Sequence, residues 1–122
     1  MRKTIQSGSE VVHLSIHSFT PIFNGETRET DVGILYDEAL EIERVISAEI
    51  YQILNKHLSR TKIELNKPYK GIDDGFTTYL RPCFPIGKYA GIEIEINQKL
   101  FDQTDYKRIR NALNDAMKYL KK

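Results

Sequence analysis

Ala90-Gly91-Ile92-Glu93-Ile94-Glu95-Ile96-Asn97 is the stretch that decides the fold of this 122-residue chain. Apolar and polar side chains alternate along it without a fault. Successive side chains of a strand point to opposite faces, so the stretch predicts a strand with one apolar and one polar face. The segment Val11–His17 repeats this design. Its faces divide into Val12, Leu14 and Ile16 on one side and Val11, His13, Ser15 and His17 on the other.

The rest of the chain alternates short strands with amphipathic helices. Further strands are predicted over 31–36 and around 62–66, and helices over 37–58, over 76–81 and from residue 104 to the C-terminus. Asp37 and Thr104 are the expected N-caps of the two long helices. Residues 18–30 are expected to form a loop that turns at Asn24-Gly25. Strands alternating with helices predict one α/β unit over residues 1–122, with a mixed, mostly parallel sheet flanked by helices.

Composition excludes several functional classes. Hydrophobic residues make up 40% and charged residues 29%, which is typical of a soluble globular domain. The net charge of +1 gives no indication of binding to nucleic acid or to an anionic membrane. The single cysteine permits no internal disulfide. The start, Met1–Gln6, lacks the apolar stretch of a signal peptide, and no apolar run reaches membrane-spanning length, so we expect a cytoplasmic protein.

The polar faces of the two alternating strands hold the residues best suited to chemistry. A histidine and a carboxylate at neighbouring strand ends would suit a zinc ligand and a general base. The alternative is that both polar faces are simply solvated. His13 and His17 share a face but lie about 13 Å apart along a strand, so we expect at most one to bind a metal, and His17, at the strand end, is better placed. His13 is expected to be a hydrogen-bonded interior residue, and His57, late in a helix, a structural one.

Six motifs occur in order along residues 11–101. They are His13–Pro21, Asn24–Arg28, Asp31–Asp37, Pro68–Gly71, Asp74–Thr78 and Tyr89–Gln98. On these motifs the chain resembles the N-formylglutamate amidohydrolase (deformylase) family, which is related to the zinc carboxypeptidases. The resemblance implies a phosphorylase/hydrolase-like fold and a zinc-dependent hydrolysis of an amide or formyl bond.

The resemblance also implies roles for individual residues. His17, followed by Ser18 and an aromatic residue, matches the motif that supplies the last zinc ligand. Glu95 matches the glutamate that activates the zinc-bound water, whereas Glu93 stands where relatives often carry an uncharged polar residue and is not chosen as the base.

Four further residues are implied as substrate-binding. Arg28 becomes a candidate for holding a substrate carboxylate, which a guanidinium fork suits, with a surface salt bridge as the alternative. Ser18, which follows the zinc-ligand histidine, is included with it. Asp74 and Arg81 are weaker candidates for shaping the rim of the pocket.

The chain departs from the family in its metal ligands. The family's other zinc ligands lie in an N-terminal half that has no counterpart here, and Cys83, between two prolines, is expected to pack rather than to bind metal. A catalytic zinc normally takes three protein ligands. We therefore expect the C-terminal portion of a family member with an incomplete zinc site, acting on a small amide or N-formyl amino acid once it associates with a missing N-terminal half or as a homo-oligomer. The alternative is a catalytically inert α/β module that oligomerises or binds a partner.

Overall fold

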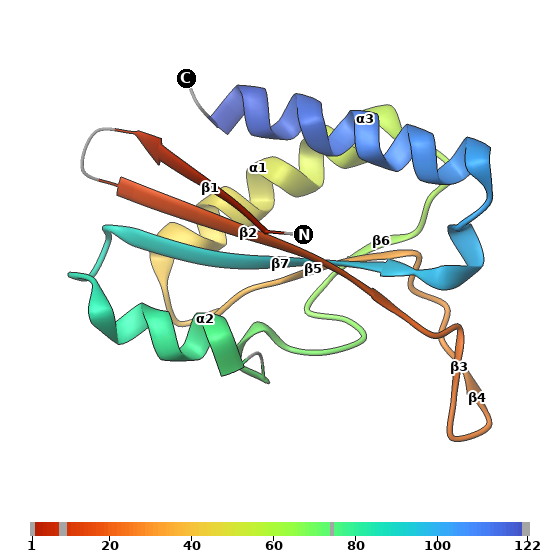
Figure 1. Ribbon diagram of the computed structural model, residues 1–122, viewed down its shortest axis with the longest axis horizontal. Coiled ribbons are helices and arrows are strands. Elements are labelled where there is room, and N and C mark those ends of the chain that lie inside the picture. The colour runs from red at the N-terminus through yellow and green to blue at the C-terminus, as the bar shows by residue number, and fades with distance from the viewer. Residues whose placement is uncertain (1, 8–9, 74, 121–122) are drawn as a thin grey trace.

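The two strands predicted from alternation, β2 (Glu10–Phe19) and β7 (Tyr89–Asn97), lie side by side in a five-stranded sheet (Figure 1). The computed structural model describes residues 2–7, 10–73 and 75–120. The other strands of the sheet are β1 (Arg2–Ser7), β5 (Val32–Leu35) and β6 (Ile63–Leu65). The helices are α1 (Glu41–His57), α2 (Gly75–Leu80) and α3 (Gln103–Leu120), with short 3₁₀ turns at Gly71–Asp73, Arg81–Cys83 and Gln98–Leu100.

The sheet order is β1-β2-β7-β5-β6. The pairs β2–β7 and β5–β6 are parallel, and the pairs β1–β2 and β5–β7 are antiparallel, so the predicted α/β class and mixed sheet are confirmed. Strand β1 was not predicted. Its sequence contains one apolar residue, Ile5, so alternation gives no signal there, and the strand pairs along the sheet edge through its backbone.

One face of the sheet carries the hydrophobic core. Helices α1 and α3 both lie on this face, and α2 lies on the other (Figure 1). The core joins alternate residues of the strands to one stripe of each long helix, which is why both helices are amphipathic. Its most deeply buried members include Leu14, Ile34, Ile92, Ile94, Ile50, Leu54 and Ile109.

The polar face of the central strands is covered, so the alternative that both polar faces are simply solvated is wrong. Glu93 and Glu95 are only 7% and 6% exposed. Two glycines let other segments approach this face closely. A Cβ on Gly91 would touch Thr77 of α2, and a Cβ on Gly33 would collide with the carbonyl of Lys67. The segment after β6 therefore passes directly over β5, next to Glu95.

The loop predicted over residues 18–30 contains a small hairpin. Strands β3 (Ile22–Phe23) and β4 (Glu26–Thr27) pair antiparallel, and the turn Asn24-Gly25 has φ values of +53° and +78°. Positive φ at both central residues is the geometry that favours Asn-Gly in two-residue hairpins. The predicted turn is confirmed, and the hairpin extends away from the sheet beyond the carboxyl end of β2 (Figure 1).

Both predicted helix caps are wrong. Helix α1 begins at Glu41, and the Asp37 carboxylate instead accepts from the amide of Ala39 in the preceding turn. Thr104 lies inside α3, and Asp102 caps that helix by accepting from the amide of Asp105 at 2.8 Å. Asp and Thr are both good caps, so the residue types alone do not fix the first turn. None of the described helices is long and apolar enough to cross a membrane.

The Asp102 cap predicts a local dependence on pH. The amide of Asp105 holds the pKa of the Asp102 carboxyl below its ordinary 3.8, so this cap stabilises α3 above that value and is lost as the pH falls through the lower folded pKa. The hydrogen bond to Asp102 raises the pKa of Asp105, which partly offsets the effect. We expect the Asp105 amide proton shift to titrate with a midpoint below 3.8.

NMR titration measures this midpoint. Asp102→Asn is the control, because asparagine keeps the cap without the titrating group, and its Asp105 amide should lose that transition. If the Asp105 amide of the wild-type chain shows no transition below 3.8 that Asp102→Asn abolishes, the cap assignment is contradicted.

Candidate functional site

His17 and two glutamates meet at the carboxyl ends of the two central parallel strands. In the β2–β7 register His17 stands opposite Glu95 and Ser15 opposite Glu93, so all four side chains share the covered face. Nε2 of His17 lies 3.2 Å from Oε1 of Glu93. The His17 side chain is 41% exposed, whereas that of Glu93 is 9% exposed. An accessible imidazole thus stands over two buried carboxylates.

Ser15 adds a buried hydroxyl to this cluster. It is fully buried, and its Oγ has no hydrogen-bond partner among the described residues. Buried hydroxyls are usually paired, because an unpaired one costs about 1–3 kcal/mol. The Ser15 hydroxyl is therefore free to bond to a water or a ligand beside the carboxylates of this cluster.

Arg28 lies near the same end of β2, among aromatic rings. Its guanidinium carbon is 4.6 Å from the ring centre of Phe23, 5.1 Å from that of Tyr69 and 5.6 Å from that of Phe19. Nη1 donates to the carbonyl of Thr20 at 3.4 Å. Phe19 follows His17 by two residues on β2, so the arginine lies close to the histidine cluster. In the described parts of the chain, Arg28 contacts aromatic rings and a carbonyl. It makes no contact there with a carboxylate, which the alternative role of a surface salt bridge requires.

The other predicted substrate residues lie in different settings. Ser18 is exposed, and its hydroxyl accepts from Nε2 of Gln98 at 3.2 Å, at the same strand end as His17. Asp74 lies outside the described residues. The structure does not bring Arg81 to His17. Arg81 lies near Gly91 of β7. Gly91 precedes Glu95 by four residues, a distance of about 13 Å along the strand.

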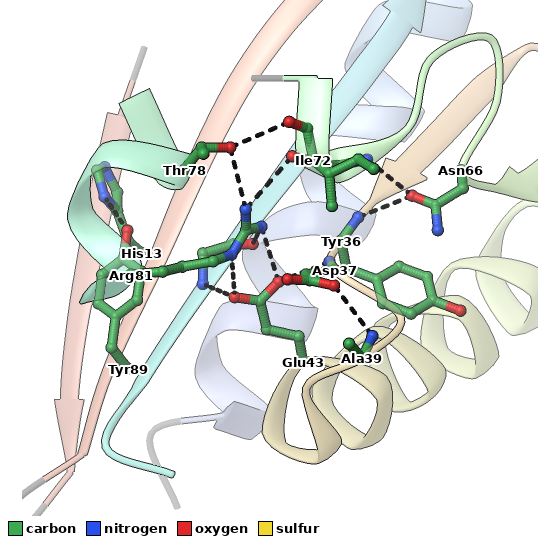
Figure 2. Close-up of polar contacts among 12 residues, drawn as sticks. His13, Tyr36, Asp37, Ala39, Glu43, Asn66, Ile72, Thr78, Arg81 and Tyr89 are labelled. Carbon is green, nitrogen blue, oxygen red and sulfur yellow. Dashed lines mark hydrogen bonds and ion pairs between the residues drawn. The ribbon is translucent and has the colours of Figure 1, made fainter. Parts of the chain in front are cut away.

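Arg81 forms a buried ion pair with Glu43, as Figure 2 shows. Its Nε and Nη2 donate to the two oxygens of Glu43, each at 2.8 Å, and Nη2 also donates to the carbonyl of Gly91. Glu43 is 0% exposed and additionally accepts from the amides of Asp37 and Gly91. Every contact of this pair is internal, so its role in the fold is structural.

The remaining candidates lie largely where the sequence indicated. The Nδ1 atom of buried His13 is 3.2 Å from the hydroxyl of Tyr89, which confirms its hydrogen-bonded interior role. His57 faces Asp115 of α3 at 3.7 Å, as a structural residue would. Cys83, which was expected to pack rather than to bind metal, is exposed, and its thiol contacts the carbonyl of Tyr79.

Glu93 is the residue that sequence reasoning missed. The choice of Glu95 as base left Glu93 without a role, yet Glu93 is the carboxylate in contact with His17. A signal existed in the register. If two parallel strands pair with His17 opposite Glu95, the residue two positions earlier is a diagonal neighbour within reach of a long side chain.

The cluster fits zinc in the type of its donors but not in their number. Imidazole nitrogen and carboxylate oxygen are both common zinc ligands. Within residues 2–7, 10–73 and 75–120, no three His, Cys, Asp or Glu side chains gather closely enough to hold a metal ion. His17 is the accessible donor, and a complete catalytic site would need further ligands.

Comparison with known proteins supports the fold alone. No model of a protein family matches the chain, and no curated protein matches it. Among solved structures, the chain is similar to the crystal structure of gene product Atu2144 from Agrobacterium tumefaciens, with a TM-score of 0.63 and 24% identity. The match covers 93% of this chain and 44% of that protein, so the chain spans less than half the length of its structural relative. The two share an α/β fold.

Proposed function

We propose that this chain carries the C-terminal portion of a zinc-dependent amidohydrolase site with a zinc-carboxypeptidase-like fold. His17 is the zinc ligand, Glu95 is the general base, and the substrate is a small amide or N-formyl amino acid that bears a carboxylate. The observation that carries the proposal is the pairing of His17 with Glu95 across two parallel strands, at their carboxyl ends. Open α/β sheets bind ligands at this end of their strands. The proposed setting is the cytoplasm.

Glu93 gives His17 a defined orientation. Because Nε2 of His17 lies 3.2 Å from Oε1 of Glu93, this nitrogen donates to the carboxylate and Nδ1 carries the lone pair. A carboxylate behind a metal-binding histidine fixes its tautomer and increases its basicity. Nδ1 is therefore the atom offered to the metal. When bound, zinc would polarise the scissile carbonyl and lower the pKa of a coordinated water.

We assign the proton transfer to Glu95. It stands beside His17 on the same face and is 6% exposed, so its carboxylate is held in a site with little bulk water. As general base it would take a proton from the attacking water and pass it to the leaving nitrogen. Tyr69 and Phe23 support the guanidinium of Arg28, whose fork would bind the substrate carboxylate.

The proposed site needs two more protein ligands than His17 supplies. We propose that they come from a neighbouring segment of the gene product or from a second copy of the chain. The exposed aromatic and aliphatic side chains of the hairpin, Ile22 and Phe23, lie at this end of the sheet and would be covered by such an association.

Zinc binding tests the metal assignment. In the complete gene product we expect stoichiometric zinc and a loss of zinc affinity of roughly 100-fold or more in His17→Ala, since even residues behind a ligand contribute 10–100-fold. Calorimetric titration measures the affinity. The matched control is His57→Ala, an exposed histidine on α1 that should leave zinc binding unchanged. Equal affinity in the wild type and His17→Ala would exclude His17 as a ligand.

The second candidate is an inert α/β module that binds a partner or itself. It is favoured by the surroundings of His17, where the described neighbours include carboxylates but no cluster of three metal ligands. A complete gene product without zinc, and without metal-dependent hydrolysis, supports this reading. Tight stoichiometric zinc binding to the chain alone excludes it and requires a site shared between copies.

A further inference from the structure

A groove opens at the end of the sheet opposite His17. It lies between the first half of α1, the segment from Pro82 to Gly87 and the end of α3, beside the starts of β2 and β7. Its volume is about 910 Å³. Small-molecule sites are clefts of roughly 300–1,000 Å³, so the groove is large enough for a complete ligand of that class. No residue proposed above for zinc or substrate binding lies in it except Arg81, which is committed to Glu43.

The walls of the groove are apolar and partly aromatic. Ile86 is 95% exposed, and Val45 and Tyr119 are about half exposed. The ring of Phe84 stacks on that of Tyr89, with centroids 4.7 Å apart and planes inclined by 10°. Covering such exposed apolar side chains with an apolar ligand surface is energetically favourable. Tyr119 is the exposed aromatic residue among these lining side chains, and the face of its ring can attract a cation.

Most of the charged side chains among the described residues that line the groove are negative. Four carboxylates line it, from Glu10, Asp37, Glu41 and Glu49. Among the described residues that line the groove the one cation is Arg81, and Glu43 neutralises it through two bonds of 2.8 Å. The whole chain has a net charge of +1, so this acidic lining is a local feature rather than a consequence of composition.

The geometry points to a second binding site, for an organic cation with an apolar body. The carboxylates attract an ammonium group, the ring of Tyr119 favours the same charge, and the apolar walls cover the body of the ligand. A cleft of this size encloses a small molecule. An anion of the same shape would meet four carboxylates and no free cation among the lining residues. The site is independent of the proposed hydrolase site, from which the length of the sheet separates it.

NMR titration of the chain with 4-phenylbutylamine tests the site. A ligand of this size should bind in the millimolar range, on the order of 0.3 kcal/mol per heavy atom. We expect saturable shifts confined to the groove, at Val45, Ile46 and Ile86. The matched anion, 4-phenylbutanoate, should bind at least about tenfold more weakly, and added salt should weaken amine binding, because the attraction is between exposed charges.

Variants locate the charge preference. Glu49→Gln and the double variant Glu41→Gln/Glu49→Gln should weaken amine binding roughly threefold to tenfold. Glu49 lies on α1 and makes no hydrogen bond or ion pair with the described residues. The single variant therefore tests the site even if the double variant is less stable. Glu26→Gln, on the distant hairpin, is the control and should have no effect. Equal binding of amine and anion, unchanged binding in Glu49→Gln, or groove shifts that follow protein concentration instead of amine would overturn the proposal.

Discussion

Arg81→Met is expected to destabilise the fold by about 3–5 kcal/mol, because it leaves a buried carboxylate without its partner. Glu43 is 0% exposed, and both of its oxygens bond to Arg81 at 2.8 Å. The loss should therefore exceed that of any exposed ion pair in the molecule.

The position of the pair in the fold increases the effect. Glu43 belongs to α1, and it also accepts from the amides of Asp37, before that helix, and Gly91, in β7. Arg81 adds bonds to the carbonyls of Gly71 and Gly91. One carboxylate and one guanidinium thus join the start of α1, the 3₁₀ turn at Gly71 and the central strand. Removing either group frees several backbone groups as well as a charge.

Urea denaturation measures the change in unfolding free energy. Arg44→Met is the matched control, because Arg44 is an exposed arginine on α1, the helix of Glu43, and donates to the carbonyl of Glu38. This substitution should lower the unfolding free energy by less than about 1 kcal/mol. The double variant Glu43→Leu/Arg81→Met should recover only part of the lost stability, because it removes the unpaired buried charge but leaves the amides of Asp37 and Gly91 without an acceptor. Equal effects of Arg81→Met and Arg44→Met would contradict the burial of the pair.

The sequence predicted the framework because period-2 and helical patterns reflect burial directly. Strands β2 and β7 alternate cleanly, and the two long helices each bury one stripe. Strand β1 was not predicted, because an edge strand pairs through its backbone and needs few apolar residues. The helix starts were misplaced because Asp37 and Thr104 are plausible caps whose neighbours decide the outcome.

The candidate site was predictable only in part. His17 was singled out because a strand end can be read from the sequence, and Glu95 was chosen over Glu93 by the family resemblance. The structure pairs the two residues in register. The contact of Glu93 with His17 depends on which strands pair, and the burial of both glutamates depends on segments that cross Gly33 and Gly91. Contacts between segments far apart in the chain leave no local pattern in the sequence. The ion pair of Arg81 with Glu43 joins residues 38 positions apart and is hidden for the same reason.

Glu95→Gln is expected to lower the kcat of the complete, zinc-loaded gene product by about 10²–10⁴-fold, the range that a positioned general base contributes. Glutamine has nearly the same shape as glutamate, so it preserves the packing of this residue against Gly33 on β5. It cannot accept the proton of the attacking water. Because the loss falls on proton transfer rather than on binding, KM should change little.

Glu93→Gln is the matched control two residues earlier on the same face of β7. Its amide oxygen still accepts from His17, so the histidine keeps its orientation and the change should cost at most about 10–100-fold, through zinc affinity. Excess zinc should restore much of the activity of this variant and none of that of Glu95→Gln. The two carboxylates can thus be assigned to different roles by one pair of substitutions.

The most direct test of the central claim is the rate of formate release from N-formylglutamate by the complete gene product, wild type against Glu95→Gln, at saturating zinc. The account predicts zinc-dependent release by the wild type and a loss of about 10²–10⁴-fold in the variant, with zinc content unchanged. Full activity in Glu95→Gln would contradict the assignment of the pair His17–Glu95 as the catalytic centre.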